Sequence, residues 1–399
     1  MKLKKFLDEK GEIYKDINVD RIKIFWRENK AKFNYKPVAQ IVGTNGKGST
    51  GRILAIAALK GGLNVGHFTS PHIFDFSERF WLNGDIVNSE ILDETHDIVL
   101  GKIGENAASD LSYFEYTCIL AIELFSKCDL IILEAGLGGE FDATSVFDQK
   151  LLLVTPIAFD HQNFLGNTIK EIAATKLKAA GSDIILAKQE FSEVYMITEM
   201  IAKERKINVF RAENLSPDLE NFEDQNSPKF MAINRQLSFA AAQKLNIKTD
   251  IKEFLISPLF GRMSQIAPNI ILDVGHNEQA ARTIACELAA KGAQVNLIYN
   301  SFLDKDFSAV LTALKPVVKR CFIIAVNSER IAKKADLERV LARENIEFAD
   351  FNGDLKQSED YLVFGSFSVA ETFMKFYRGG KLAANTPARE TFESGEDAQ

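Results

Sequence analysis

The segment GTNGKGS (43–49) has the composition of a loop that holds phosphate groups. Its glycines allow backbone N–H groups to approach phosphate oxygens, and a helix that starts here adds the positive end of its dipole. Lys47 could meet the β- and γ-phosphates of a nucleotide, and Ser49 supplies the hydroxyl that follows such a lysine. The spacing departs from GxxxxGK[ST], because Gly48 stands between the lysine and the serine. A glycine-rich turn with one incidental lysine is the competing interpretation.

An apolar run and a helical pattern flank this loop and favour the nucleotide interpretation. PVAQIVGT (37–44) predicts a buried strand, and STGRILAIAALKGG (49–62) predicts a helix closed by glycines. ATP brings Mg²⁺, which prefers oxygen ligands and is usually held by one or two carboxylates. Glu134 ends the strand-like DLIILE and precedes the flexible AGLGG, so we expect it to bind the metal. The alternative for this residue is a solvated glutamate at a strand end.

Apolar runs alternate with helical patterns along the chain, which predicts an α/β fold. Further strands are expected at 63–70, 129–136 and 151–159, and helices at 113–127, 168–181 and 234–245. The alternation continues through SDIILA (182–187), a helix and KINVFR (206–211). Residues 212–230 are polar and predict a loop or a short hairpin.

A second, smaller α/β unit is expected in the last third of the chain. Segment 257–269 contains Pro and Gly without a helical period, so it is the predicted domain hinge. Beyond it we expect strands near 270–277, 294–299, 320–326 and 361–365, with helices near 278–291, 306–315, 335–344 and 366–378. The predicted domains are therefore 1–262 and 263–378, and residues 379–399 are expected to form a disordered tail.

Composition restricts the class of protein. The 399 residues are 46% hydrophobic with a formal net charge of −7, which argues against a nucleic acid partner. No run approaches the roughly 20 apolar residues of a membrane span, and the N-terminus lacks the apolar region of a signal peptide. We therefore expect a cytoplasmic protein without membrane partners. The cysteines show no metal-binding spacing, and we expect reduced, mostly buried thiols at Cys118, Cys128, Cys286 and Cys321.

Nine motifs occur in one order along the chain: GTNGKGST (43–50), TSPHIFDFSERF (69–80), YFEY (113–116), ILEAGLGGEFDAT (132–144), FDH (159–161), FGR (260–262), DVGHN (273–277), DKD (304–306) and GSF (365–367). Together they resemble the folylpolyglutamate synthase and dihydrofolate synthase family of the Mur ligase superfamily, over nearly all of residues 12–378. The resemblance implies a P-loop ATPase-like N-terminal domain, a smaller Rossmann-like C-terminal domain and an active site between them. It also implies a ligase that phosphorylates a carboxylate with ATP and joins the glutamate amine to the resulting acyl phosphate.

The resemblance assigns the ligands of the nucleotide and the metal. ATP would be held by Thr44, Asn45, Gly46, Lys47, Gly48, Ser49, Asn234, Arg262 and Asp273. Two Mg²⁺ ions are expected, with Ser70, Glu134, His161 and a carbamylated Lys176 as ligands. A glutamate commonly precedes this lysine in the family, whereas Thr175 precedes it here, and Lys178 is a neighbouring candidate. Catalytic roles would fall to Lys47, Lys176, Arg262 and His276.

The resemblance also places the other substrates. The acceptor, dihydropteroate or a folate, would contact Asp16, Ile17, Asn18, Val19, Ser112, Tyr113, Phe114, Glu115, Phe141, Asp142 and Ala143. His276 and Asn277 would face L-glutamate or the reacting phosphate, and His276 is one candidate for the base that deprotonates the amine. Two positions depart from the family, since Glu140 stands where a basic residue is common and Ser145 where Asn is usual.

Two other functions remain as alternatives. A Mur-type ligase acting on a UDP-sugar peptide is expected to carry an extra N-terminal domain of about 100 residues for that nucleotide, which we do not find. A P-loop module that uses ATP as a switch would not need Arg262, Asp273 and His276. The residues do not separate dihydrofolate synthase from folylpolyglutamate synthase activity, and one site could serve both. No apolar helix demands a partner chain, so we expect a monomer.

Overall fold

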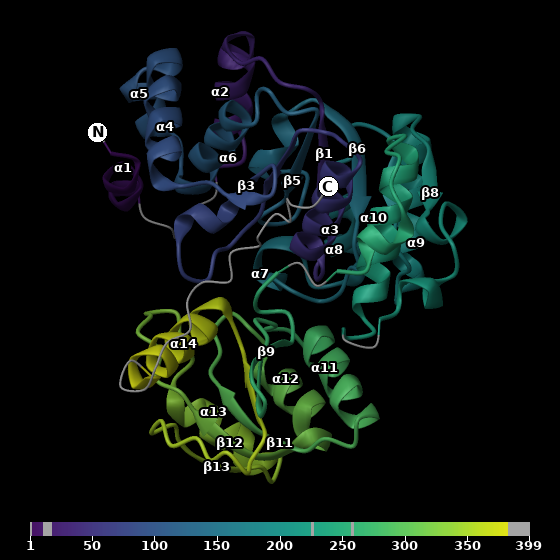
Figure 1. Ribbon diagram of the computed structural model, residues 1–399. Coiled ribbons are helices and arrows are strands. Elements are labelled where there is room, and N and C mark those ends of the chain that lie inside the picture. The colour runs from purple at the N-terminus through teal and green to yellow at the C-terminus, as the bar shows by residue number, and fades with distance from the viewer. Residues whose placement is uncertain (1, 11–17, 225–226, 257–258, 382–399) are drawn as a thin grey trace, which may run out of the picture.

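The computed structural model describes residues 2–10, 18–224, 227–256 and 259–381. Figure 1 shows two parts, each built on one sheet: an N-terminal part coloured from purple to teal and a C-terminal part coloured from green to yellow. None of the described helices combines the length and the apolar character needed to span a membrane.

The first sheet consists of β1 (Val38–Val42), β2 (Val65–Phe68), β3 (Phe80–Leu82), β4 (Asp85–Ile86), β5 (Leu130–Glu134), β6 (Gln149–Val154), β7 (Ile184–Leu186) and β8 (Val209–Arg211). Its strand order is β4-β3-β2-β5-β1-β6-β7-β8, and all neighbours pair in parallel except β2–β3 and β3–β4. Every residue of β1, β2 and β5 is buried, as expected for parallel strands covered on both faces.

The helices of this part are α1 (Leu3–Lys10), α2 (Arg21–Asn29), α3 (Lys47–Lys60), α4 (Ser89–Ile103), α5 (Glu105–Asp110), α6 (Tyr113–Leu124), α7 (Gln162–Leu165), α8 (Ile169–Leu177), α9 (Ser192–Arg205) and α10 (Met231–Lys244). Short 3₁₀ turns lie at η1 (Lys30–Lys32), η2 (Phe76–Arg79), η3 (Ala143–Val146), η4 (Ala212–Asn214), η5 (Leu219–Phe222) and η6 (Ile251–Phe254).

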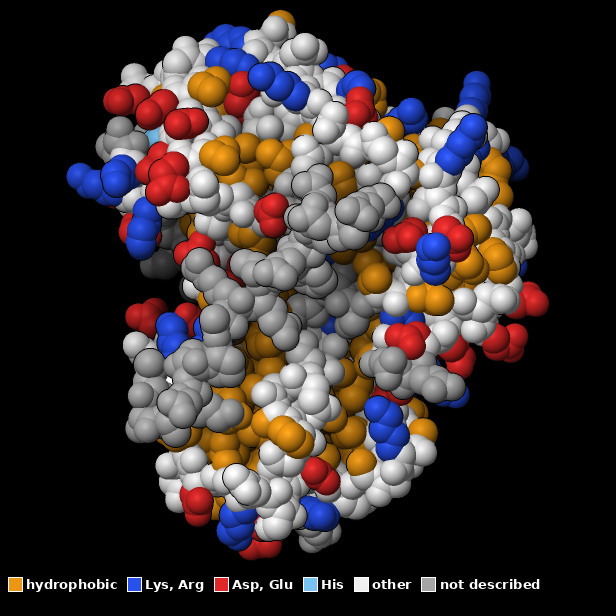
Figure 2. Space-filling view, viewed as in Figure 1, with side chains coloured by type: hydrophobic (Ala, Val, Ile, Leu, Met, Phe, Trp, Pro, Cys, Tyr) orange, Lys and Arg blue, Asp and Glu red, His pale blue; other side chains and the backbone are white. Residues whose placement is uncertain are grey.

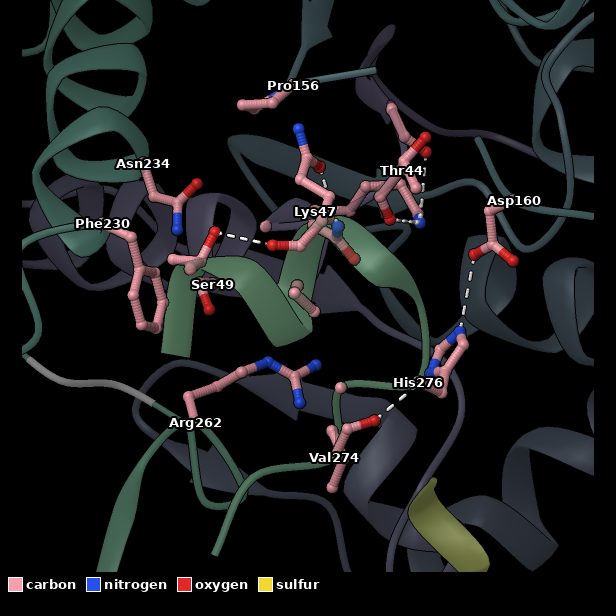
Figure 3. Close-up of a pocket in the computed structure, with 18 of the residues that line it drawn as sticks. Thr44, Lys47, Ser49, Pro156, Asp160, Phe230, Asn234, Arg262, Val274 and His276 are labelled. Atoms are coloured by element: carbon pink, nitrogen blue, oxygen red, sulfur yellow. Dashed lines mark hydrogen bonds and ion pairs between the residues drawn. The ribbon is translucent and has the colours of Figure 1, made fainter. Parts of the chain in front are cut away.

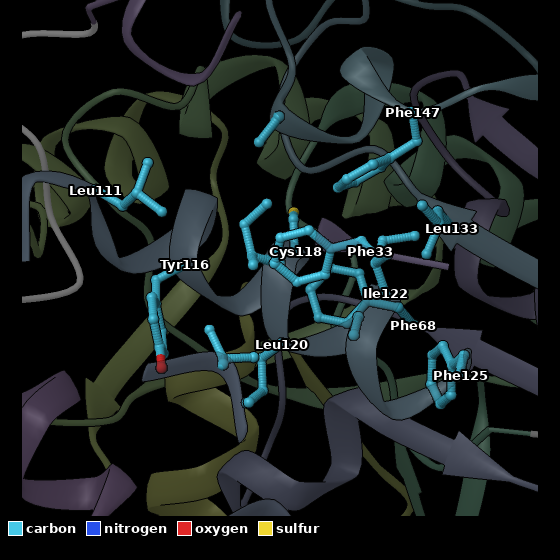
Figure 4. Packing of buried hydrophobic residues seen from close by; sticks show 14 of the residues in the cluster. Phe33, Phe68, Leu111, Tyr116, Cys118, Leu120, Ile122, Phe125, Leu133 and Phe147 are labelled. Atoms are coloured by element: carbon cyan, nitrogen blue, oxygen red, sulfur yellow. The ribbon is translucent and has the colours of Figure 1, made fainter. Parts of the chain in front are cut away.

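Side chains of β5 alternate between two cores, so the first part is a three-layer sandwich. Ile131 and Leu133 pack with α6 in one cluster, and Figure 4 shows Phe68, Tyr116, Ile122 and Phe125 among its buried apolar side chains. Ile132 packs on the opposite face with α3 and α10.

The second sheet consists of β9 (Ser264–Ala267), β10 (Ile270–Leu272), β11 (Val295–Tyr299), β12 (Val318–Ile323), β13 (Glu347–Asp350) and β14 (Tyr361–Phe364). Its order is β13-β12-β11-β14-β10-β9, parallel apart from the β9–β10 pair. The helices α11 (Glu278–Ala290), α12 (Phe307–Leu314) and α13 (Lys334–Arg343) pack on one face, and α14 (Phe367–Lys381) packs on the other, with η7 (Lys315–Val317) before β12.

The predicted α/β alternation is confirmed, and the differences lie at the sheet edges. The β3–β4 hairpin was not predicted from the sequence. Asn83-Gly84 between the two strands is nevertheless a strong hairpin signal, and the two residues have positive φ angles of 50° and 113°. The predicted hinge includes residues 257–258, which lie outside the described chain, and β9 occupies its second half. Residues 379–381 of the predicted tail belong to α14, and 382–399 lie outside the described residues.

The prediction of mostly buried cysteines is confirmed. Cys118, Cys128 and Cys321 are buried, whereas Cys286 is exposed. His67 and His96 are fully buried in the first part, where Arg52 donates to His67 Nδ1 and His96 Nδ1 lies 2.6 Å from the Tyr116 hydroxyl.

Candidate active site

A cavity of about 450 Å³ lies where the two parts meet. Its lining comes from the phosphate loop, from the ends of β5 and β6, and from the turn after β10. Figure 3 shows Lys47 and Ser49 in the middle, Asn234 and Phe230 on one side, and Arg262 and His276 reaching in from the second part. In the view of Figure 2, acidic and basic side chains intermingle around the edges of both parts. Inside the cavity, Lys47, Lys176 and Arg262 supply positive charge for an anionic ligand.

The phosphate loop begins the helix as predicted, with α3 starting at Lys47. Gly46 has φ +90°, and a Cβ there would lie 2.3 Å from the Asn234 side-chain oxygen, so only glycine fits. Lys47 Nζ donates weakly to the carbonyl oxygens of Gly43 (3.4 Å) and Thr44 (3.3 Å), and therefore lies over the loop. Asn234, one of the predicted ATP ligands, thus lies directly against the loop.

Oxygen atoms gather beside this loop. Glu134 is only 5% exposed and accepts hydrogen bonds from the Thr69 hydroxyl and from the Ser70 backbone N–H at 3.2 Å. Lys47 Nζ lies 3.9 Å from the same carboxylate. The Ser49 hydroxyl is buried and has no hydrogen-bond partner within the described chain. A buried hydroxyl and a buried carboxylate beside a phosphate loop form a donor set that suits a hard cation.

A second polar cluster joins the two parts. Lys305 Nζ, from the second part, donates to Asp160 Oδ1 at 2.5 Å and lies 3.2 Å from His161 Nε2. His276 Nε2 is 3.5 Å from the other Asp160 oxygen. The side chains of Lys305 and Asp160 are only 5% and 7% exposed. Asp160 and Lys305 are residues that the site prediction missed, although both stand inside quoted motifs.

Titration of this cluster is set by burial and by its contacts. Burial raises the pKa of Asp160, but the hydrogen bond from His276 and the charge of Lys305 outweigh it and hold the pKa well below its usual value. Burial lowers the pKa of His161 to about 3, against the opposing effect of Asp160. His161 is therefore neutral near pH 7, which is the form of imidazole that binds metals. Asp160, His161 and His276 offer ligand atoms within 4.8 Å of one another.

Lys176 lies against the phosphate loop. Its side chain is buried and donates to the Gly43 carbonyl oxygen at 2.8 Å. Burial, reinforced by the charge of Lys47, lowers its pKa to about 7. Lys178, by contrast, is half exposed and pairs with Glu140 at 3.3 Å. The structure therefore puts Lys176 and not Lys178 in the cavity, and Glu140 is neutralised outside it.

The second part contributes the turn after β10. Asp273 accepts from the backbone N–H groups of Met263 (2.8 Å) and Gly275 (2.7 Å), and burial raises its pKa. Arg262 lines the first cavity with its guanidinium 5.4 Å from the Phe367 ring centroid. Asn277 caps α11 and exchanges two hydrogen bonds with Asn45, at 3.0 and 3.1 Å, so it joins the two parts.

A second cavity of about 730 Å³ adjoins the first. It is lined by all of the predicted acceptor contacts that the structure describes: Asn18, Val19, Ser112, Tyr113, Phe114, Glu115, Phe141, Asp142 and Ala143. Asp16 and Ile17 lie outside the described residues. Both cavities share the wall made of Ser70, Pro71, Gly136 and Leu137.

Internal contacts fix the acceptor-side residues. Glu115 pairs with Arg21 at 2.6 Å and closes the capping box of α6 with Ser112. Asp142 accepts from the backbone of Leu137 and from Thr144, and burial raises its pKa despite these bonds. The polar side chains at this edge of the second cavity are therefore held by contacts within the chain.

Lys305→Met is expected to lower the free energy of unfolding by about 3–5 kcal/mol, because it leaves Asp160 buried without its cation. Lys334→Met is the matched control, since Lys334 pairs with Asp350 at 2.6 Å on the surface, where the loss of an ion pair should change the free energy of unfolding little. Urea unfolding measures both. If both variants lowered the free energy of unfolding by the same small amount, the Lys305–Asp160 pair would not be a buried ion pair that stabilises the contact between the two parts.

No family model matches the chain. The crystal structure of Helicobacter pylori folylpolyglutamate synthetase is similar with a TM-score of 0.76 and 36% sequence identity, covering 94% of this chain and 98% of that one. Escherichia coli FolC with ADP gives a TM-score of 0.81 at 25% identity, over 95% and 98% of the two chains. The dihydrofolate synthase/folylpolyglutamate synthase of Haemophilus influenzae is 28% identical over 410 residues, 90% of this chain and 93% of that protein.

Identity of 36% over almost the whole of both chains, together with the same two-sheet architecture, shows the relationship that the motifs predicted. The chain belongs to the folylpolyglutamate synthase/dihydrofolate synthase family and has the Mur ligase fold.

Proposed function

We propose that this chain ligates L-glutamate to dihydropteroate, to a (tetrahydro)folate or to both, at the expense of ATP. The shared wall of the two cavities carries the proposal. One cavity starts at a phosphate loop and the other has aromatic walls, so a phosphoryl donor and a ring-bearing carboxylic acid can meet between them. Escherichia coli FolC, 25% identical over 94% of this chain, has been solved with DHPP and ADP, which supports the same pair of ligands here.

The proposed chemistry has two steps. A carboxylate oxygen of the acceptor attacks the γ-phosphorus of ATP, the bond to ADP breaks, and an acyl phosphate forms. The amine nitrogen of L-glutamate then attacks the acyl carbon, the bond to phosphate breaks, and the amine loses a proton. Lys47 and Arg262 supply positive charge in the first cavity, and such fixed charge contributes most to phosphoryl transfer. His276 also lines this cavity, where it could accept the proton.

The oxygen donors beside the phosphate loop fit Mg²⁺. The orphaned Ser49 hydroxyl, Ser70 and the Glu134 carboxylate would hold one ion. His161 and Lys176 line the same cavity and would serve a second one. When bound, Mg²⁺ neutralises phosphate charge and polarises the bond that breaks. The number of ions stays a prediction.

Lys176 is proposed to carry a carbamate. Its amine is buried against the phosphate loop. Because the pKa of Lys176 is about 7, a large fraction of the amine is unprotonated at neutral pH, and its lone pair can then react. Addition of CO₂ to a neutral lysine amine releases one proton and gives a carboxylate-like group. That group would turn a cation beside Lys47 into a metal ligand.

The domain division at 262/263 is likewise a proposal, supported by the start of the second sheet at Ser264. The monomeric state and the cytoplasmic location stay predictions.

The proposed function predicts ADP release that depends on ATP, Mg²⁺, L-glutamate and an acceptor. Turnover is expected with dihydropteroate, with tetrahydrofolate or with both, and the two acids are assayed separately. Turnover with neither acid would contradict the proposal, and turnover with a UDP-sugar peptide would replace it with the Mur-type function.

Glu134→Gln is expected to abolish turnover while the unfolding midpoint changes little, because the amide keeps the shape of the side chain but loses its charge.

The carbamate predicts a ¹³C resonance in protein equilibrated with ¹³C-bicarbonate. Lysine reacts with CO₂ only when it is unprotonated, so this signal should rise as the pH increases through about 7, the pKa of Lys176. Lys176→Ala should remove the signal, and Lys178→Ala should leave it unchanged. A signal that survives the Lys176 substitution would place the modification elsewhere.

A further inference from the structure

Three of the four residues that the C-terminal part contributes to the wall of the second cavity are polar: Ser328, Arg330 and Ser368, with Phe302 beside them. The N-terminal part supplies the aromatic side chains Tyr113, Phe114, Phe141 and Phe164, together with polar side chains that include Arg21, Arg79 and Glu115. A ring-bearing acceptor fits the aromatic side. The polar side, which carries a guanidinium and two hydroxyls, fits an anion.

Arg330 is held in a fixed place on this wall. Its Nη2 donates to Asp304 Oδ1 at 3.0 Å, and its guanidinium lies 4.6 Å from the centroid of the Phe302 ring. Its backbone carbonyl oxygen accepts from the Leu303 N–H at 2.7 Å, and Phe302 forms a bridge with Ile331. Only one nitrogen meets Asp304 in these contacts, and arginine has five N–H donors in a planar fork that matches a carboxylate.

Asp304 and Lys305 connect this wall to the first cavity. Asp304 holds Arg330, and the next residue, Lys305, holds Asp160 at 2.5 Å. Another arginine of the second cavity, Arg21, is engaged by Glu115 at 2.6 Å. The consecutive residues Asp304 and Lys305 therefore connect Arg330 to Asp160 in the first cavity.

The incoming amino acid has two carboxylates at different distances from its amine. The α-carboxylate lies next to the amine and hence beside the acyl carbon at the shared wall, while the side-chain carboxylate extends farther. Arg330 lines the second cavity and not the first. We propose that Arg330 binds the side-chain carboxylate of the incoming L-glutamate and that Asp304 positions its guanidinium. This inference rests on the proposed function and makes Arg330 the residue that distinguishes glutamate from glutamine.

Arg330→Gln tests the assignment by steady-state kinetics. A charge-assisted hydrogen bond to a carboxylate is lost, so KM for L-glutamate should rise by about 10- to 100-fold, with KM for ATP and for the acceptor nearly unchanged. The preference for glutamate over glutamine, as a ratio of kcat/KM, should fall by a similar factor. Arg330→Lys should restore part of it, and Asp304→Asn should raise KM for glutamate to a smaller extent.

Arg320→Gln is the matched control. Arg320 also pairs with an acid, Glu347 at 3.2 Å, also lies over a phenylalanine ring, and has a similar side-chain exposure of 40% against 43%, but it is not part of the cavity wall. It should leave KM for glutamate unchanged. The assignment would be overturned if Arg330→Gln changed only KM for the acceptor, or if it changed only the discrimination between glutamate and its analogue with an amide in place of the α-carboxylate. It would also be overturned if Arg330→Gln had no effect. If the wild-type chain turned over no folate-type acid, the proposed function itself would fail instead.

Discussion

Parallel strands that end at one edge of a sheet determine where chemistry can occur in this molecule. β1, β2, β5 and β6 are neighbours in the first sheet, so the loops that follow them meet at its carboxyl edge. This edge brings together the phosphate loop, Ser70, Glu134 and Asp160, although they are spread over more than a hundred positions. Glycine is required where these loops touch, since a Cβ at Gly136 would lie 2.7 Å from the Phe114 ring and one at Gly139 2.3 Å from the Lys176 carbonyl oxygen.

The second sheet completes the site through polar contacts that are too buried to be incidental. The Lys305–Asp160 pair and the reciprocal Asn45–Asn277 hydrogen bonds connect the two parts beside the first cavity. Charge buried at a junction is stable only when its partner is in place, so the geometry of the junction is closely specified. The same contacts place Arg262 opposite Lys47 and bring the Arg330 wall to the aromatic cavity. The contacts that join the two parts are thus the same contacts that complete the site.

Much of the fold and of the site could be predicted from the sequence, because phosphate loops and buried parallel strands have strong local patterns. The first strand, its helix and the lining positions Glu134, Asn234 and Asp273 follow from such patterns or from the family motifs. The partner of Lys305 could not be predicted, since 145 positions separate it from Asp160 and only the folded chain brings them together. The ion pair between Glu140 and Lys178 could not be predicted either, because it depends on how the loop after β5 packs on α8. Short antiparallel edge strands carry too few residues for a clear alternation.

We propose that a carboxylate in the aromatic cavity takes phosphate from a nucleotide in the adjoining one. Acceptor labelled with ¹⁸O in its reacting carboxylate tests this directly when the released phosphate is analysed by mass spectrometry. Transfer through an acyl phosphate predicts one ¹⁸O atom in each inorganic phosphate, formed only when L-glutamate is ligated. Phosphate without the label, released during amide formation, would contradict the account.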